Sequence, residues 1–281
     1  MTRELRTINN EPETLIRAGQ HEAGYWRDLW SYRELLYFLA WRDLLIRYKQ
    51  TVAGSTWALL RPALNTLVFT ILFSRLGKFP SDGVPYPVMV LAGMVPWQLF
   101  SGAILGGTQS LVSNSNLISK VYFPRLIIPC STLGVALVDF LFTAILLLGV
   151  MLYYGVMPTW RMALLPVLVL FALLASLGPS LLISALMVKF RDFKHVVPFL
   201  IQLGAYVCPV GFSTSIVPEK WRTLYSCNPL VGVIDGFRWV IHGGAALHVQ
   251  GLIISIVVTL LFLVTGVWYF RKTERSFADV I

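Results

Sequence analysis

Few residues in this chain have types and spacings that could carry out chemistry. The four histidines, His21, His195, His242 and His248, are scattered along the sequence, whereas a metal site needs three or more ligands that converge. The patterns G-x-x-x-x-G-K-S/T, H-E-x-x-H and G-x-S-x-G are absent. We therefore expect no catalytic residues and no metal site. Any energy for uphill transport must come from another chain or from an ion gradient.

Asp139 is the one acidic side chain inside a predicted apolar segment. An ionisable group within a membrane span indicates a function by default, such as proton coupling. The alternative is that Asp139 pairs with a basic residue near an inner helix end and fixes helix packing. A secondary transporter usually needs several such groups, so a single Asp argues against that class. Both roles of Asp139 stay open.

The apolar composition of the chain indicates which kind of structural element must position these residues. Of 281 residues, 56% are hydrophobic and 13% are charged, against about 25% charged residues in an average soluble domain. This composition excludes an ordinary cytosolic enzyme, a disordered chain, a disulfide-stapled secreted module and nucleic-acid binding through a basic surface. The net charge of +9 therefore concerns membrane topology. The class is a polytopic membrane protein.

Six apolar segments are long enough to be membrane-spanning helices, at roughly 20 residues each, and predict an all-α fold. These segments lie near Trp57–Leu76, Tyr86–Val112, Leu126–Tyr154, Met162–Val188, Val196–Phe212 and Gln250–Phe270. Pro96, Pro179 and Pro209 lie inside them, and a span tolerates proline where neighbouring helices satisfy the freed backbone groups. We therefore expect these helices to pack inside a bundle.

The distribution of Lys and Arg indicates the orientation. With the N-terminus inside, the inner segments hold 17 of these residues and the outer segments hold 6, which predicts both termini in the cytoplasm. No basic stretch leads into a short apolar run near Met1, so we expect no cleavable signal. The predicted organisation is a cytoplasmic arm with an interface helix (1–56), a six-helix transmembrane domain (57–270) and a cytoplasmic tail (271–281).

Residues 31–50 are predicted to form a helix ahead of the first span. Apolar side chains recur at helical spacing along one face, at Tyr37, Trp41, Leu44 and Tyr48. An aromatic stripe beside basic residues is typical of a helix that lies in the membrane interface. The alternative is a cytosolic helix that packs against the rest of the chain.

The outer segment Ser213–Val249 contains an apolar stretch, Leu230–Ile241, that is too short to span the bilayer. We expect short interfacial or re-entrant helices here. Cys208 and Cys227 lie near the predicted outer face of the membrane, where oxidising conditions permit a disulfide. Two free, buried thiols are the favoured alternative.

Two cytoplasmic turns combine basic and aromatic residues. The first covers residues 114–125, and the second, residues 189–194, joins the fourth and fifth spans. Positive charge on inner loops explains the basic residues without any partner, but it does not explain the aromatic side chains between them. We predict that these turns dock into a groove on a partner protein.

Six motifs follow one another over residues 41–279. They are Trp41–Trp57 with Arg61-Pro62, Val84–Pro87 with Gly93–Trp97, Asn116–Arg125, Phe190–Asp192, Cys208–Val210 with Asn228-Pro229, and Phe270–Asp279. With these motifs the chain resembles the membrane (permease) subunits of ABC-type polysaccharide exporters, which export O-antigen, capsule and teichoic-acid polymers. Ala53, where the pattern has a larger aliphatic residue, and the longer N-terminal arm depart from it.

The resemblance implies a transport subunit, not an enzyme. Two copies would form a channel as a homodimer, and two cytoplasmic ABC ATPase subunits would bind ATP and Mg, so no cofactor is expected in this chain. The cargo would be a glycan on a polyprenyl diphosphate, with O-antigen favoured, moved across the bacterial inner membrane. The implied ATPase-coupling residues are Asn116, Lys120, Tyr122, Phe123, Arg125, Phe190, Arg191, Asp192 and Lys194.

A sugar polymer presents CH faces that stack on aromatic rings and hydroxyls that need neutral polar partners, which suits a chain with few charges and 13% aromatic residues. The resemblance points to the first and fifth spans as channel-lining, with the candidates Phe69, Phe73, Gln202 and Tyr206. An outer collar is predicted from Trp221, Tyr225 and Trp239. Candidates for the lipid diphosphate, or for general attraction to anionic membrane lipid, are Arg42, Arg47 and Lys49.

Other classes stay open at the level of sequence. A capsule or teichoic-acid exporter and a drug or lipid ABC exporter share the expected architecture. A membrane enzyme that transfers a glycan or acyl group would need clustered acid, base or metal-binding residues, which the sequence lacks. A proton-coupled secondary transporter is opposed by the single Asp139 and by the lack of visible inverted halves. Nucleic acid is not an expected partner.

Overall fold

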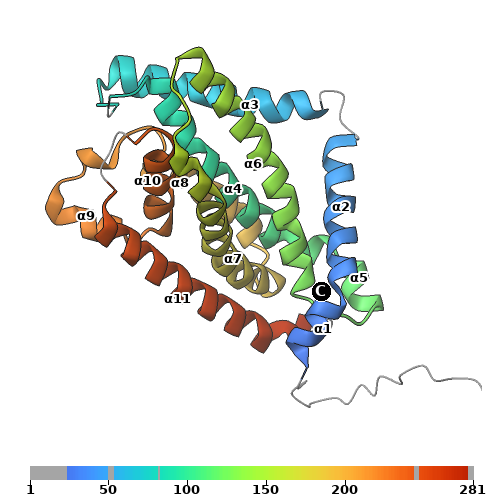
Figure 1. The fold of residues 1–281 in the computed structure, drawn as a ribbon. Coiled ribbons are helices and arrows are strands. Elements are labelled where there is room, and N and C mark those ends of the chain that lie inside the picture. The colour runs from blue at the N-terminus through green and yellow to red at the C-terminus, as the bar shows by residue number, and fades with distance from the viewer. Residues whose placement is uncertain (1–23, 50–53, 82, 244–246, 278–281) are drawn as a thin grey trace, which may run out of the picture.

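The computed structural model describes residues 24–49, 54–81, 83–243 and 247–277, and within these ranges the chain is helical with no strand. The predicted all-α class is therefore confirmed. Several long helices run side by side through the molecule, whereas the helix at residues 54–69 runs at a steep angle to them, and shorter helices lie near both ends (Figure 1). The predicted arm up to residue 23 and the departure at Ala53 lie outside the described residues.

Five helical segments are long and apolar enough to cross a membrane. The first consists of α3 (Gly54–Phe69) and a π-helix, η1 (Thr70–Leu76). The second is α4 (Tyr86–Ser113) and the third is α6 (Ile127–Tyr153). The fourth joins a short 3-10 helix, η2 (Trp160–Leu164), to α7 (Leu165–Lys189), and the fifth joins α11 (Val249–Thr273) to η4 (Glu274–Ser276).

The fifth of the six predicted spans, Val196–Phe212, is not confirmed as a membrane-spanning helix. Its segment forms α8 (Phe193–Val207), which has 15 residues. At roughly 1.5 Å per residue this helix is about 22 Å long, shorter than the roughly 30 Å of a hydrocarbon core. The helix ends at Val207 because Cys208 adopts an extended conformation and Pro209 follows it.

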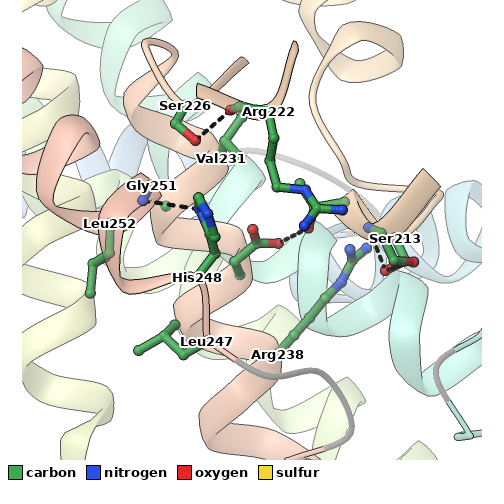
Figure 2. Close-up of a pocket in the computed structure, with 13 residues that line it drawn as sticks. Ser213, Arg222, Ser226, Val231, Arg238, Leu247, His248, Gly251 and Leu252 are labelled. Carbon is green, nitrogen blue, oxygen red and sulfur yellow. Dashed lines mark hydrogen bonds between the residues drawn. The ribbon is translucent and has the colours of Figure 1, made fainter. Parts of the chain in front are cut away.

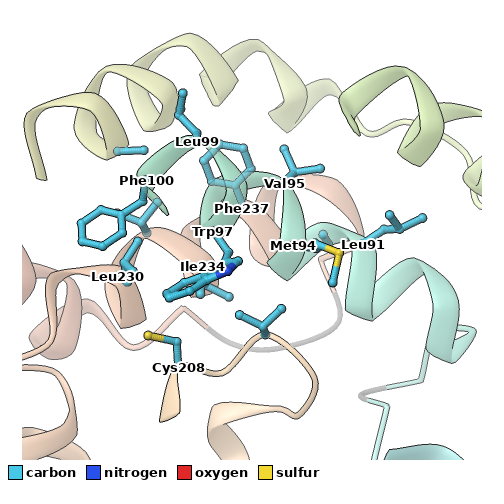
Figure 3. Close-up of a cluster of buried hydrophobic side chains, with 14 of the residues drawn as sticks. Leu91, Met94, Val95, Trp97, Leu99, Phe100, Cys208, Leu230, Ile234 and Phe237 are labelled. Atoms are coloured by element: carbon cyan, nitrogen blue, oxygen red, sulfur yellow. The ribbon is translucent and has the colours of Figure 1, made fainter. Parts of the chain in front are cut away.

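Helix α4 forms the centre of the bundle and packs against α6, α7 and α10. Its first half is almost completely buried: Leu91, Val95 and Leu99 are at most 1% exposed. Figure 3 shows these side chains packed with Phe237 and Ile234 of α10. The apolar core is therefore built around one spanning helix and one short helix.

Helices α7 and α11 approach each other through two glycines. A Cβ atom at Gly178 would lie 2.5 Å from the carbonyl carbon of Phe262, and one at Gly266 would lie 2.3 Å from the carbonyl oxygen of Gly178. Small residues allow this close backbone contact between membrane helices. The two helices are locked together along the side of the bundle that Figure 1 shows in olive and red.

The outer segment forms three short elements: η3 (Thr214–Ile216), α9 (Glu219–Tyr225) and α10 (Pro229–Ile241). The side chain of Asn228 accepts a hydrogen bond from the backbone of Leu230 at 3.1 Å, which caps α10. The 13 residues of α10 are too few to span a membrane, as predicted, and most are buried. Interfacial or re-entrant placement of these helices stays a prediction.

Both ends of the described chain lie at the other end of the bundle, with α1 (Tyr25–Ser31), α2 (Arg33–Lys49) and α5 (Ser115–Lys120). A buried apolar cluster, here called the basal cluster, joins the helix ends that meet there. Its members include Leu111, Ile118, Phe123, Val188, Phe270 and Phe277. The loops after the second and fourth long helices therefore lie on the same side as both termini of the described chain.

Candidate functional site

A cavity of about 720 Å³ lies between α2, α3, α4 and α6, and we call it the α3–α4 cavity. Its walls combine basic, aromatic and neutral polar side chains with one carboxylate. These residues include Arg47, Arg61, Tyr48, Trp57, Phe69, Trp97, Asn65, Gln98, Ser101 and Asp139. Ligand pockets commonly have volumes of about 300–1,000 Å³ and few, well-placed polar groups.

Asp139 is held on the cavity wall by α2. Arg47 forms an ion pair with the Asp139 carboxylate at 2.6 Å, and the hydroxyl of Tyr48 donates a hydrogen bond to the same carboxylate. Burial and this hydrogen bond raise the pKa of Tyr48, so the phenol stays a neutral donor. The structural interpretation of Asp139, pairing with a basic residue that precedes the first span, agrees with this geometry.

The α4 wall is tied to α6 by neutral polar groups. Thr143 donates a hydrogen bond to the amide oxygen of Gln98 at 2.5 Å, and Gln98 lines the cavity. Ser101 lies nearly one turn further along α4 and also lines it. An amide and a hydroxyl on this wall offer donors and acceptors without a net charge.

The α3 wall carries a residue that sequence reasoning did not place in the site. Arg61 and Asn65 are one helical turn apart and therefore share a face, and both line the cavity. The available signal was the position of Arg61 inside a predicted span, because a charged residue there is costly unless it faces a cavity or a partner. Arg61 and Arg47 give the cavity two guanidinium groups.

Three of the four predicted lining residues belong to one aromatic cluster. Phe69 stacks on Phe73 with ring centroids 5.5 Å apart and lies 5.8 Å from Tyr206 of α8. Phe73 also contacts Phe79 at 5.7 Å and Phe212 at 6.2 Å. We call these five residues the aromatic cluster. Phe69 belongs to both the cluster and the α3–α4 cavity.

Gln202, the fourth predicted lining residue, is exposed on α8 one turn before Tyr206. The aromatic cluster is placed by the π-helical turn η1, which carries Phe73. Turns of this kind occur frequently at functional sites. Close packing also requires Gly211, where a Cβ atom would lie 2.6 Å from the Phe73 ring.

The loop after α8 is held by hydrogen bonds to its carbonyl groups. Arg238 donates to the carbonyls of Val210 at 3.0 Å and Phe212 at 2.8 Å, and Tyr86 donates to the carbonyl of Gly211 at 2.7 Å. Arg238 is 2% exposed, so these bonds satisfy a buried charge. They fix the position of Phe212 in the aromatic cluster.

The predicted outer collar is spread over two elements. Trp221 is exposed on α9, and the hydroxyl of Tyr225 donates to the carbonyl of Val207 at 2.7 Å. Trp239 of α10 lies under the guanidinium of Arg161, 4.7 Å from its ring centroid. Among the described residues no ring contact joins the three collar side chains to one another.

The two predicted coupling turns project from the basal end. In the first turn the exposed members are Asn116, Lys120 and Tyr122. In the second turn all four are exposed: Phe190, Arg191, Asp192 and Lys194. Phe123 differs, because it is 4% exposed and packs in the basal cluster.

Arg125, the last predicted coupling residue, ties the first turn to the C-terminal helix. Its backbone N–H donates to Glu274 Oε1 at 2.8 Å, and its guanidinium donates to the Glu274 carbonyl. The hydroxyl of Tyr25 donates to Glu274 Oε2 at 3.0 Å, and Arg271 lies 4.4 Å from the Tyr25 ring centroid. Three segments far apart in sequence are thereby fixed together.

The three predicted headgroup residues lie in different surroundings. Arg42 donates to Asp43 and to the side chain of Asn114 at 2.8 Å, which connects α2 to the end of α4. Arg47 lines the α3–α4 cavity, whereas Lys49 is exposed. The predicted helix at 31–50 is confirmed as α2, which packs on α6 while Tyr37 and Trp41 remain at least half exposed.

Two further predictions concern the cysteine thiols and a metal site. Both thiols are free, as favoured from the sequence, and Cys208 is buried, but the predicted burial of Cys227 is wrong because its side chain is exposed. The side chain of Asn228 donates to the Cys208 sulfur at 3.2 Å. Within the described ranges, no three His, Cys, Asp or Glu residues lie close enough to hold a metal ion.

The molecule is a bundle of apolar helices with a cavity lined by polar and aromatic side chains. The chain belongs to the ABC-2 type transporter family, which it matches over residues 34–242. It is 30% identical over 258 residues to the O-antigen export system permease protein RfbA of Myxococcus xanthus, covering 91% of this chain and 98% of that protein.

Two further relatives extend the comparison. A protein of the same name from Klebsiella pneumoniae is 26% identical over 250 residues, covering 88% of this chain and 95% of the relative. The polysialic acid transport protein KpsM of Escherichia coli is 21% identical over 238 residues, covering 84% and 92%. The names of all three describe transport or export, and none describes an enzyme.

Proposed function

We propose that this chain is the permease subunit of an ATP-driven exporter that moves a lipid-linked polysaccharide, most closely of the O-antigen class, out of the cytoplasm. The observation that carries the proposal is the wall chemistry of the α3–α4 cavity in a chain related to O-antigen export permeases. Trp57, Trp97 and Phe69 offer faces for sugar CH groups, and Asn65 and Gln98 offer neutral hydrogen-bonding partners.

Two copies of the chain form the channel in this proposal. In the apolar window of the first span only 17% of the residues are buried. Leu67 of α3 and Leu203 and Tyr206 of α8 are exposed around the aromatic cluster. A second copy that covers part of this surface would enclose Gln202 and the aromatic cluster in a shared pathway.

Six membrane crossings, with α8 as the fifth, are part of the proposal. Tyr25 bonds to Glu274, so the segments before the first span and after the last lie at one end of the bundle. An odd number of crossings would place them at opposite ends. The excess of Lys and Arg in the inner segments supports the cytoplasmic side for that end, and the membrane is the bacterial inner membrane.

Two ABC ATPase subunits dock on the basal end, at the exposed turns around Lys120 and Arg191, and these subunits bind ATP and Mg. Exposed aromatic side chains, Tyr122 and Phe190, give each turn an anchor for a groove on the ATPase. Arg47 and Arg61, supported by Arg42 and Lys49 on α2, attract the diphosphate of the lipid carrier.

The test is affinity purification of the tagged chain from its native membrane, together with analysis of surface glycan in a deletion strain. We expect a stoichiometric soluble subunit with a phosphate-binding loop, and in the deletion strain loss of surface polysaccharide with lipid-linked glycan retained inside. Recovery of a chain that is active alone in a proton gradient would overturn the proposal. Restoration of surface glycan by the plasmid-borne chain is the control.

A further inference from the structure

A second polar cavity, separate from the α3–α4 cavity, lies at the outer end of the bundle and encloses about 270 Å³. We call it the outer pocket. It is bounded by the loop at Ser213–Ser215, by α9, by α10 and by the start of α11. Figure 2 shows Arg222, Arg238 and His248 around the same space, each arriving from a different element.

Most of the residues that line the outer pocket have polar side chains. Eight of its 13 lining residues have polar side chains: Ser213, Thr214, Ser215, Arg222, Ser226, Asp235, Arg238 and His248. Withdrawing polar groups from water costs free energy unless they gain hydrogen-bonding partners. A cavity lined this way is suited to a ligand that itself carries many hydroxyl groups.

Two side chains in the wall of the outer pocket carry N–H donors. The buried Nε of Arg222 has no hydrogen-bond partner, and one Nη of Arg222 reaches the carbonyl of Val217 at 3.3 Å. The backbone N–H of Gly251 donates to His248 Nδ1 at 3.0 Å. This bond leaves the proton of the neutral imidazole on Nε2, which makes Nε2 a donor.

Asp235 supplies a hydrogen-bond acceptor that complements these donors. Thr214 donates to one oxygen of the Asp235 carboxylate, and an ionised carboxylate accepts hydrogen bonds through both of its oxygens. Arg238 forms the base of the pocket, because its guanidinium is committed to the carbonyls of Val210 and Phe212. Two guanidinium groups and one carboxylate leave a small excess of positive charge.

Glycines shape the pocket. A Cβ atom at Gly251 would lie 2.6 Å from His248 Nδ1 and 2.7 Å from Ser226 Oγ. A Cβ atom at Gly232 would lie 2.6 Å from Ser255 Oγ. The absence of side chains at these two positions lets α10 and α11 approach and keeps the polar groups close together.

We propose that the outer pocket binds one sugar unit of a polysaccharide. Each sugar hydroxyl both donates and accepts, and here a carboxylate acceptor stands beside guanidinium, imidazole and hydroxyl groups. The carboxylate of Asp235 disfavours a simple anion, and a single carboxylate is a poor site for a hard divalent cation. A volume near 270 Å³ admits one sugar ring rather than a chain.

This inference rests on the proposed export function, since it assigns the pocket to the exported glycan or to glycan already outside the membrane. Binding must be weak, because a transport pathway has to release each unit it holds. We therefore expect dissociation constants on the order of 1 mM, which corresponds to about −4 kcal/mol.

The test uses the full chain with its co-purifying ATPase in lipid nanodiscs prepared without glycoside detergents. Saturation-transfer NMR is recorded with glucose, mannose, galactose, N-acetylglucosamine and glucuronate, one at a time, and with inorganic phosphate and acetate as non-sugar probes. We expect saturable binding of at least one sugar and none of the non-sugar probes. Binding of phosphate or acetate alone, or of no sugar, overturns the inference.

Two variants locate the bound sugar. Arg222→Gln removes the guanidinium and should weaken binding about tenfold, as loss of a charged hydrogen bond does. His248→Asn retains a cap for α11 but lacks the Nε2 donor, and should weaken binding several-fold. Lys220→Gln removes a cation from an exposed position on the same helix and should leave binding unchanged. If Arg222→Gln and His248→Asn bind the sugar as tightly as Lys220→Gln does, the inference is overturned.

The same samples separate this inference from the export proposal. If the wild-type chain supports polysaccharide export but no sugar signal depends on Arg222 or His248, the outer pocket has another role and the export proposal stands. If deletion of the chain leaves export intact, the export proposal fails, whatever the NMR signal shows.

Discussion

Two spanning helices of similar apolar character occupy opposite situations in this molecule. In the most apolar window of α4, 72% of the residues are buried, whereas in the window that covers α3 and η1 the share is 17%. Helix α4 contributes the centre of the core, with Leu91, Val95 and Leu99 almost fully enclosed. Helix α3 has one wall of the α3–α4 cavity on one side and exposed side chains, such as Leu67, on the other.

The difference shows what an apolar segment leaves undetermined. Both helices satisfy the requirement for a membrane span, but α4 is mostly enclosed by other helices of the chain, whereas most of α3 is not. Helix α3 carries Arg61 and Asn65 and changes to π-helical geometry at Thr70. Features of this kind have a cost in a helix that contacts only lipid, so α3 is not suited to contact with lipid alone.

The largest expected effect comes from truncating the core of α4. Leu99→Ala removes a fully buried side chain, and we expect a loss of about 2–5 kcal/mol of unfolding free energy because a cavity remains. Leu67→Ala on α3 removes a side chain that is 57% exposed and should cost less than about 0.5 kcal/mol. Thermal unfolding of the two purified variants in one detergent measures the pair. Equal losses would contradict the contrast between the helices.

The next largest effect is expected on transport, while the stability of the protein stays unchanged. Arg61→Leu makes the cavity face of α3 apolar, and we expect glycan export to fall at least tenfold while the unfolding temperature stays within error. The reason is loss of a guanidinium that faces the α3–α4 cavity. Arg75→Leu is the matched control, because Arg75 is an exposed basic residue in the continuation of the same helix. Unchanged export in Arg61→Leu would show that the α3 wall does not meet the cargo.

Much of the fold follows from local sequence. The all-α class, the five long spans, the short helix at Leu230–Ile241 and the helix at 31–50 are set by apolar length and helical periodicity. The fifth predicted span was too long, because an apolar segment that includes Pro209 continues past the end of α8 at Val207. Apolar length does not reveal where a backbone leaves the helix.

The candidate site was less accessible from sequence. The proximity of Phe69 and Phe73 is a local consequence of helical spacing, whereas their contact with Tyr206 depends on how α8 returns to the bundle. The outer pocket is assembled from four segments and has no motif. Arg61 was visible as a charge in a span, but its orientation toward the cavity depends on the rotation of α3, which no apolar pattern determines.

A smaller effect is expected in the aromatic cluster. Phe73→Leu removes ring contacts to Phe69, Phe79 and Phe212 while retaining an apolar side chain, so we expect a loss of about 1 kcal/mol. Phe199→Leu, at an exposed position on α8, should have no measurable effect on the unfolding temperature. Chemical unfolding followed by tryptophan fluorescence compares them. Equal free energies of unfolding for the two variants, measured on monomers, would show that the cluster forms only in the dimer.

The smallest effect on stability is expected at Asp139. Asp139→Asn keeps an acceptor for Tyr48 and removes the ion pair with Arg47, whose side chain is 49% exposed. Solvent screening limits such a pair to about 1 kcal/mol or less, and Arg47→Gln should have the same effect, with no further loss in the double variant. Calorimetry of the three variants measures this coupling, and export driven by ATP should persist in Asp139→Asn. Loss of export in a stably folded Asp139→Asn variant would instead assign the carboxylate to ion coupling, because a group that only joins α2 to α6 has no reason to stop transport while the helices remain packed.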